Sequence, residues 1–119
     1  MASGKHLGIL LFSTPYGYES TDTAVKMAQT ALRMGHQVSI FAYGDGVHGF
    51  TVGQRPKGIP NAEQNMSSLI EQGLAVQLCG TCLNYRGIAD NLLLNGAKRS
   101  SLSNLCKLIS ESDVFITFA

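Results

Sequence analysis

The feature of this sequence that most constrains its fold is the short, continuously apolar run Leu7–Phe12, which stops abruptly at Ser13-Thr14-Pro15. The run is too short for a core helix, so it predicts a β-strand that is buried on both faces. Such a strand belongs to a sheet with other elements packed above and below it. It therefore favours a layered α/β domain.

Strand-like and helix-like segments alternate along the rest of the chain. Apolar residues at helical spacing, with capping residues before and glycine after, predict helices, and β-branched or aromatic runs predict strands. The expected elements are a helix from Thr23 that stops at Gly35, a strand at Gln37–Tyr43, a helix capped by Asn61 that stops at Gly73, a strand at Leu74–Leu78, a largely helical segment at Leu83–Leu94 broken at Gly87, a helix at Leu102–Ile109 and a strand at Asp113–Phe118. Residues 47–60 have no periodicity and predict an irregular loop.

This order predicts one small three-layer α/β/α domain over residues 1–119, with a mostly parallel sheet of flavodoxin-like or Rossmann-like topology. If the strand order is 2-1-3-4, successive connections diverge between strands one and three, and reactive groups gather at that carboxyl edge. We therefore expect Thr14, Tyr16 and Gly17 to form a wall of a pocket around Cys79. The absence of a Gly-rich phosphate motif in this loop argues against a phosphate site.

The most informative motif is Cys79-Gly80-Thr81-Cys82. Cys79 ends a strand, where the first amide N–H groups of the next helix favour a thiolate. The spacing admits a redox dithiol, half of a zinc site, or one nucleophile with a neighbour that resolves its adducts. Cys79 meets more unpaired N–H groups than Cys82, so we expect Cys79 to attack and Cys82 to resolve. Gly80 and Thr81 would line the pocket.

A zinc site within one chain is disfavoured by the positions of the histidines. A closed site needs four ligands. His6 and His36 precede strands and are expected at the edge of the sheet opposite Cys79, whereas only His48 follows a strand. We therefore expect no metal.

Two further residues receive roles from their spacing. Arg86 lies four residues after Cys82, so we expect the two to share a helical face and Arg86 to help hold an anionic sulfur species. Cys106 falls beside Leu105 and Leu108 in an apolar helical pattern, which predicts that it packs in the core.

Charge and composition exclude several classes of function. With 9 Lys+Arg against 8 Asp+Glu, the formal charge is +1, which gives no footprint for nucleic acid or acidic membranes. No apolar run approaches the roughly 20 residues of a membrane span. Met1–His6 leads into a strand without a signal-peptide cleavage region, so a reducing cytoplasm is expected. A charged fraction of only 14% indicates surface covered by another subunit.

Several segments together resemble a known family. They are the strand followed by Thr14-Pro15-Tyr16-Gly17, then Gly35-His36, Phe41–Val47, Leu78-Cys79, Arg86-Gly87-Ile88 and Ser112-Asp113-Val114. Their order and spacing resemble the DsrE/DsrF/TusD-type sulfur-relay proteins over nearly the whole chain. The resemblance implies subunits that form trimers or hexamers, alone or with paralogous subunits, and that carry sulfane sulfur as a cysteine persulfide. Cys79 matches the sulfur-accepting position, whereas Cys82 stands where characterised relay members have alanine.

We therefore predict a sulfur carrier, or sulfurtransferase, that needs no cofactor. In this prediction Cys79 accepts sulfane sulfur from a donor protein or thiol, holds it as a persulfide and passes it to an acceptor. One alternative is a dithiol oxidoreductase that cycles Cys79 and Cys82. The other is a non-catalytic assembly subunit or a flavin-binding module.

Overall fold

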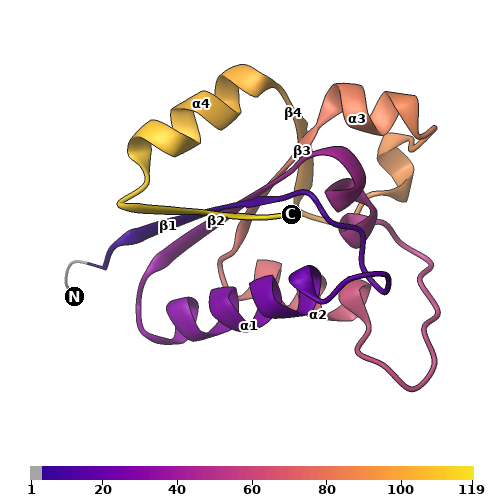
Figure 1. Cartoon of the computed structure of the whole chain (residues 1–119), viewed down its shortest axis with the longest axis horizontal. Coiled ribbons are helices and arrows are strands. Elements are labelled where there is room, and N and C mark those ends of the chain that lie inside the picture. The colour runs from indigo at the N-terminus through magenta and orange to yellow at the C-terminus, as the bar shows by residue number, and fades with distance from the viewer. Residues whose placement is uncertain (1–3) are drawn as a thin grey trace.

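The computed structural model describes residues 4–119 as a five-stranded parallel sheet with helices on both faces (Figure 1). The strands are β1 His6–Leu11, β2 Gln37–Ala42, β3 Ala75–Cys79, β4 Ala97–Ser100 and β5 Val114–Phe118. The helices are α1 Ser20–Arg33, α2 Ala62–Glu71, α3 Gly80–Tyr85 and α4 Leu102–Glu111, with short 3₁₀ helices η1 Gly44–Phe50 and η2 Asp90–Leu92. The predicted α/β class with a parallel sheet is confirmed.

Residues 1–3, on which the expectation about a signal peptide partly rests, lie outside the described part of the chain. Across residues 4–119, none of the helices combines the length and the apolar character that crossing a bilayer requires. The start of the described chain, Gly4 and Lys5, leads into the first residue of β1.

The strand order is β4-β3-β2-β1-β5. The fourth strand expected from the sequence is β5, so the four expected strands lie in the order 3-2-1-4, and the predicted order 2-1-3-4 is wrong. The chain steps in one direction from β1 to β4 and reverses once, when α4 brings β5 back to the free side of β1. The reversal therefore lies between β1 and β5, and β2 separates β1 from β3. The loop after β1 and the residue that ends β3 are on the same edge of the sheet, but they are not neighbours.

The main core lies between the sheet and the layer of α1 and α2, which cover the same face in Figure 1. Alternate residues of the central strands point into this layer, where they meet Ala24 and Ala28 of α1 and Met66 and Leu69 of α2. All four of these helical residues are buried. This packing holds β3 in place and thereby fixes the residue at its carboxyl end.

The helix α4 covers the other face of the sheet only in part. In Figure 1 it lies across the sheet from α1, and its residue contacts with the sheet are concentrated at β1. Leu108 is its one buried residue. The face of the sheet formed by β2, β3 and β4 is consequently left open beside α4.

The observed elements differ from the expectation in four places. Residues 47–50, expected in an irregular loop, belong to the 3₁₀ helix η1. The helix α1 begins at Ser20 rather than Thr23, so Ser20–Asp22 form its first turn and do not cap it. The segment Leu83–Leu94 is helical only at residues 83–85, which end α3, and in η2. The strand β4 was not expected. By contrast, Asn61 caps α2 as predicted, since its Oδ1 accepts a hydrogen bond from the Gln64 N–H at 3.0 Å.

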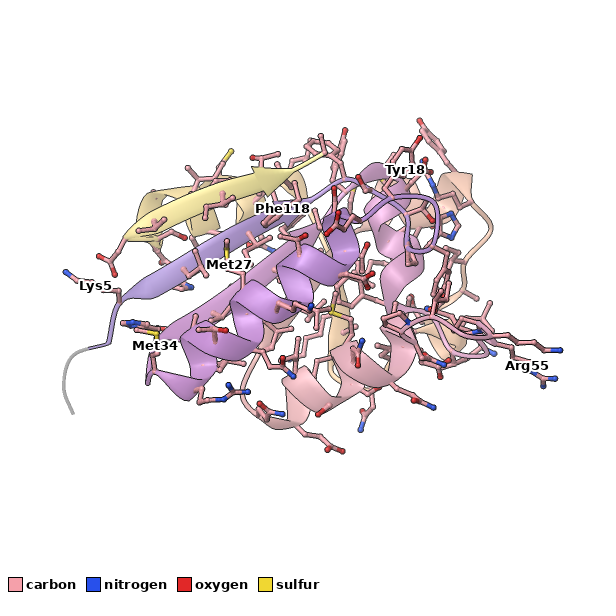
Figure 2. The ribbon with its side chains drawn as sticks, turned by 60° about the horizontal axis from the view of Figure 1, so that its bottom comes forward. Lys5, Tyr18, Met27, Met34, Arg55 and Phe118 are labelled. Atoms are coloured by element: carbon pink, nitrogen blue, oxygen red, sulfur yellow. The ribbon has the colours of Figure 1, made fainter. Side chains whose placement is uncertain are left out.

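The irregular segment that follows η1, loop 51–61, is fastened at its base. The Tyr16 hydroxyl donates to Gln54 Oε1 and accepts from the Ala62 N–H at 3.0 Å. Glu63 Oε1 accepts from the N–H groups of Gly53 and Gln54 at 2.9 and 2.8 Å. The tip of the loop extends away from the body of the molecule, as the labelled Arg55 shows in Figure 2.

Candidate functional site

Cys79 is the last residue of β3, and its side chain lies beside a cavity of about 530 Å³. The thiol-bearing residue is 4% exposed, so a reacting group must enter the cavity to reach it. Around Cys79 the lining consists of Tyr43, Gly80, Thr81, Asn84, Arg99, Ser100, Ser101 and Leu102. Gly80 and Thr81, which were expected near Cys79, both line this cavity.

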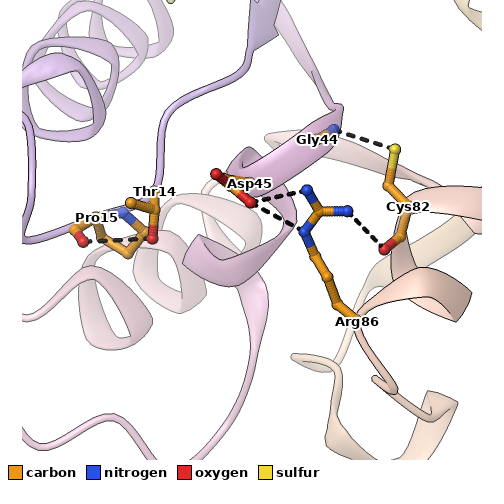
Figure 3. A network of polar contacts seen from close by, with 6 residues as sticks. All are labelled: Thr14, Pro15, Gly44, Asp45, Cys82 and Arg86. Atoms are coloured by element: carbon orange, nitrogen blue, oxygen red, sulfur yellow. Dashed lines mark hydrogen bonds and ion pairs between the residues drawn. The ribbon is translucent and has the colours of Figure 1, made fainter.

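Cys82 lies one turn further along α3 and is also buried. Its Sγ accepts a hydrogen bond from the Gly44 N–H at 3.1 Å, as the dashed line in Figure 3 shows. Burial raises the pKa of the Cys82 thiol above its ordinary value of 9.0, and a hydrogen bond to the Cys79 sulfur raises it further. The Gly44 N–H and the charge of Arg86 oppose this rise in pKa without cancelling it.

These contacts give the two thiols different roles. The Cys82 sulfur accepts a hydrogen bond from the Gly44 N–H on one side, and its thiol hydrogen-bonds with Cys79 on the other. A protonated Cys82 is a donor toward Cys79, and a thiol is a poor nucleophile while it keeps its proton. The arrangement therefore favours Cys79 as the sulfur that reacts first.

Arg86 joins α3 to η1 and does not line the cavity at Cys79. Its Nη2 and Nε donate to Asp45 Oδ1 at 2.8 and 3.0 Å, and its Nη1 donates to the Cys82 carbonyl oxygen at 3.1 Å (Figure 3). The guanidinium is thus directed toward Asp45 rather than toward a sulfur species in the cavity. It positions Gly44 and Cys82 by holding together the two elements that carry them.

Arg99 is a site residue that the sequence reasoning missed. From β4 its Nη1 donates to Gly80 O at 3.0 Å and Asn84 Oδ1 at 2.9 Å, and its Nε donates to Asp90 at 2.9 Å. A Cβ on Gly80 would lie 3.2 Å from Arg99 Cγ, so a glycine at this position lets the arginine pack closely. Recognising β4 would have placed Arg99 beside the strand that ends in Cys79.

Thr14, Tyr16 and Gly17 are not among the residues that line the cavity at Cys79. The intervening strand β2 is the reason, because it places Tyr43 next to Cys79 where the loop after β1 was expected. The Tyr16 hydroxyl is engaged with Gln54 and the Ala62 N–H instead. This loop stabilises loop 51–61 and does not form the cavity wall.

The histidines lie where the strand pattern places them. His6 Nε2 is 2.9 Å from Ser39 Oγ, and His36 Nδ1 accepts the Lys5 N–H at 3.0 Å, both at the amino ends of strands. Among the residues that the structure describes, no three or more His, Cys, Asp or Glu side chains gather where they could hold a metal ion.

Cys106 is exposed, so the prediction that it packs in the core is wrong. Its neighbours Leu105 and Leu108 do face the core cluster, but the helical rotation turns Cys106 away from the sheet. It joins Leu102 and Ile109, spaced by four and three residues, in an exposed stripe along α4. The apolar pattern of this helix is therefore wider than the face that the chain itself buries.

Comparison with known proteins gives consistent results over almost the full length of the chain. The model of the DsrE/DsrF-like family matches residues 5–118. The chain is 34% identical over 110 residues to the uncharacterized protein MJ0989 of Methanocaldococcus jannaschii, which covers 92% of this chain and 96% of that protein. It is 36% identical over 110 residues to the uncharacterized protein MK0008 of Methanopyrus kandleri, covering 92% and 91%.

Among solved structures, the crystal structure of the YchN protein from Escherichia coli is similar to this fold with a TM-score of 0.89 at 27% sequence identity. The match covers 98% of this chain and 100% of that one. The family match and the similarity of the fold agree with each other. The chain belongs to the DsrE/DsrF-like family.

Proposed function

We propose that this protein is a sulfur carrier that holds sulfane sulfur as a persulfide on Cys79. The observation that carries the proposal is the position of Cys79 at the carboxyl end of β3, where it borders a cavity of about 530 Å³. Membership of a family with sulfur-relay members supports the same chemistry. A reducing compartment such as the cytoplasm fits three cysteines that are all free thiols.

In the proposed reaction the Cys79 thiolate attacks the outer sulfur of a persulfide or polysulfide donor. A new bond forms between Cys79 Sγ and that sulfur, the donor's S–S bond breaks, and the donor leaves as a thiolate. Delivery repeats the exchange in the opposite direction with an acceptor thiolate. No net oxidation occurs, so the cycle needs no electron acceptor.

Cys82 controls how long the sulfur stays on Cys79. Its thiolate can attack the inner sulfur of the persulfide, which closes a Cys79–Cys82 disulfide and expels hydrosulfide. Burial and the hydrogen bond to Cys79 raise the pKa of Cys82, so this thiolate is scarce near neutral pH. The protein would therefore retain sulfur under ordinary conditions and release it slowly.

The test is the intact mass of the protein after incubation with sodium polysulfide, with and without reductant. Because Cys106 is exposed and can collect sulfur by itself, the measurement uses Cys106→Ser as the parent chain. We expect this parent to gain sulfur reversibly and the added change Cys79→Ser to abolish the gain. Cys82→Ala in the same parent is the matched control and should still gain sulfur.

Other outcomes separate the alternatives. Loss of two hydrogens in the parent, with no sulfur gained by Cys82→Ala, would indicate a dithiol oxidoreductase that forms a disulfide between Cys79 and Cys82. Unchanged mass in the parent, with the fold intact, would contradict the carrier function. An oxidoreductase is the second candidate because the two buried thiols are in contact and could form a disulfide.

We also propose that the chain forms a closed oligomer through α4 and β5. Leu102, Ile109 and Val114 are 51%, 46% and 52% exposed, and β5 is an edge strand with one free side. Light scattering of the protein and of Ile109→Glu tests this, because a buried carboxylate would dissociate the subunits. Val52→Glu, at another exposed apolar residue, is the control that should leave the assembly intact. A wild-type monomer at micromolar concentration would contradict the proposal.

A further inference from the structure

We propose that a polar groove next to the Cys79 cavity binds a small anionic thiol and that this thiol removes the sulfur from Cys79. The binding step is independent of the sulfur chemistry, whereas the transfer step rests on the proposed carrier function. The groove is the open part of the sheet face that α4 leaves uncovered, and it measures about 380 Å³. This is within the range of small-molecule sites in proteins, which begins at roughly 300 Å³.

The floor of the groove is polar where a sheet face would ordinarily be apolar. Gln37 and Ser39 of β2 and Gln77 of β3 line it, together with Lys98 of β4. These residues alternate with Val38, Ile40 and Val76, which point to the core on the opposite face. A row of amide and hydroxyl groups offers hydrogen bonds to a ligand that itself carries amides and carboxylates.

The groove adjoins the cavity that borders the Cys79 thiol. Ser100 and Arg99 line both the groove and the Cys79 cavity. Ser100 Oγ donates to Gln77 Oε1 at 2.7 Å and accepts from Asn104 Nδ2 at 2.8 Å, so these side chains form a polar boundary at the junction. In β3, Gln77 and Cys79 are two residues apart and therefore point to the same face. A ligand that lies along the floor can extend its end past Ser100 into the Cys79 cavity.

The charge of the groove selects an anionic ligand. Lys98 and Lys107 both line it, and in residues 4–119 neither forms an ion pair. Arg99, at the junction, is paired with Asp90 outside the groove. Glu111 is the only carboxylate among the lining residues. Two unpaired ammonium groups against one carboxylate attract a ligand that carries carboxylates of its own.

The burial of Cys79 points to a slender acceptor. At 4% exposure, its sulfur is reached through the cavity and not from a flat surface. A small peptide-like thiol meets all these requirements, because its amides match the floor, its carboxylates match Lys98 and Lys107, and its sulfhydryl can extend into the cavity. Glutathione has this chemistry and serves as the probe.

The transfer step is a thiol exchange. The bound thiol, as its thiolate, attacks the outer sulfur of the Cys79 persulfide and forms a new S–S bond. The bond between Cys79 Sγ and that sulfur breaks, and Cys79 leaves as a thiolate. The small thiol departs as a persulfide, and the proton that it lost on binding passes to solvent.

Binding is tested first on the unloaded Cys106→Ser chain with S-methylglutathione, which cannot react. Calorimetry or NMR titration should give saturable binding, and Lys98→Gln with Lys107→Gln should weaken it about tenfold, as expected for the loss of two ion contacts. The control is Lys26→Gln, an exposed lysine on α1 at the other face of the sheet. No saturable binding, or equal weakening by the control, would overturn the proposed site.

Transfer is tested with the persulfide-loaded chain and two acceptors, glutathione and the uncharged 2-mercaptoethanol. We expect the double lysine variant to slow transfer to glutathione about tenfold and to leave transfer to 2-mercaptoethanol unchanged. Equal rates for glutathione in parent and variant would overturn the assignment of the groove as the acceptor site. Failure to load Cys79 would contradict the carrier function instead, and the binding titration would still decide whether the groove takes the anionic thiol.

Discussion

The two faces of the sheet are built from the same strands but differ in what they contain. Toward α1 and α2, the central strands β2 and β3 present aliphatic side chains, namely Val38, Ile40, Val76 and Leu78, all of them buried. Toward α4, the intervening residues are Gln37, Ser39, Gln77 and Cys79, with Phe41 buried among them. One face stabilises the fold, and the other carries the groups that can react or bind.

The difference shows how a small domain separates stability from chemistry. Because successive residues of a strand point to opposite faces, Leu78 belongs to the core and Cys79 to the cavity although they are adjacent in sequence. Packing in the core layer fixes the position of the β3 backbone, and the backbone in turn fixes the position of the Cys79 thiol. Substitutions on the two faces should therefore have different consequences.

The largest effect on stability is expected from Leu78→Ala compared with Gln77→Ala. Leu78 is fully buried, so its truncation leaves a cavity and should lower the free energy of unfolding by about 3 kcal/mol. Gln77 is half-buried and loses one hydrogen bond to Ser100, which should cost under about 1 kcal/mol. Guanidinium unfolding measures both. Similar decreases in the free energy of unfolding for the two variants would contradict the proposed difference between the two faces of the sheet.

A second prediction concerns Cys82, which lies on α3 in contact with Cys79 and should affect chemistry more than stability. Its raised pKa means that the fraction of Cys82 thiolate grows as pH rises toward and beyond 9.0. Decay of the Cys79 persulfide, followed as sulfide release, should accelerate over that range. In Cys82→Ala the persulfide should last longer and its decay should lose this rise with pH. Equal decay in both proteins would assign Cys82 a packing role only.

The smallest effect is expected at the ion pair between Arg86 and Asp45. The pair is partly exposed, so Arg86→Gln should lower the free energy of unfolding by under about 1 kcal/mol. The charge of Arg86 lowers the pKa of Cys82, and its removal should raise that pKa further and slow sulfide release at a given pH. Faster release in this variant would show that the lost positioning of Cys82 outweighs the lost charge.

The sequence was sufficient for the elements with strong periodicity and for placing Cys79 at the end of a strand. The apolar run of β1, the amphipathic α1 and α2, and the position of Cys79 at a strand end are all local properties. The strand β4 was not predicted, because Ala97-Lys98-Arg99-Ser100 is a short edge strand without an apolar pattern. Without it, neither Arg99 nor the groove beside Lys98 could be anticipated.

The order of the strands and the exposure of Cys106 depend on tertiary packing. Local periodicity identifies a strand but does not say which strand lies beside it, and the insertion of β2 between β1 and β3 moved the loop at Thr14 away from Cys79. The apolar pattern around Cys106 also identifies a helix without saying how much of it the same chain covers. In both cases the element itself was predicted correctly, and the error concerns which part of the chain packs beside it.

The attachment of loop 51–61 to Tyr16 has a consequence for limited proteolysis. The Tyr16 hydroxyl holds Gln54 near the start of the loop and the Ala62 N–H just after its end. Between them, Arg55 is followed by proline and resists trypsin, so the exposed bond after Lys57 is the site open to cleavage. In Tyr16→Phe both attachments are lost together, and a protease should cut this bond faster while the sheet remains protected. The rate of that single cut therefore reports how tightly two distant loops are joined.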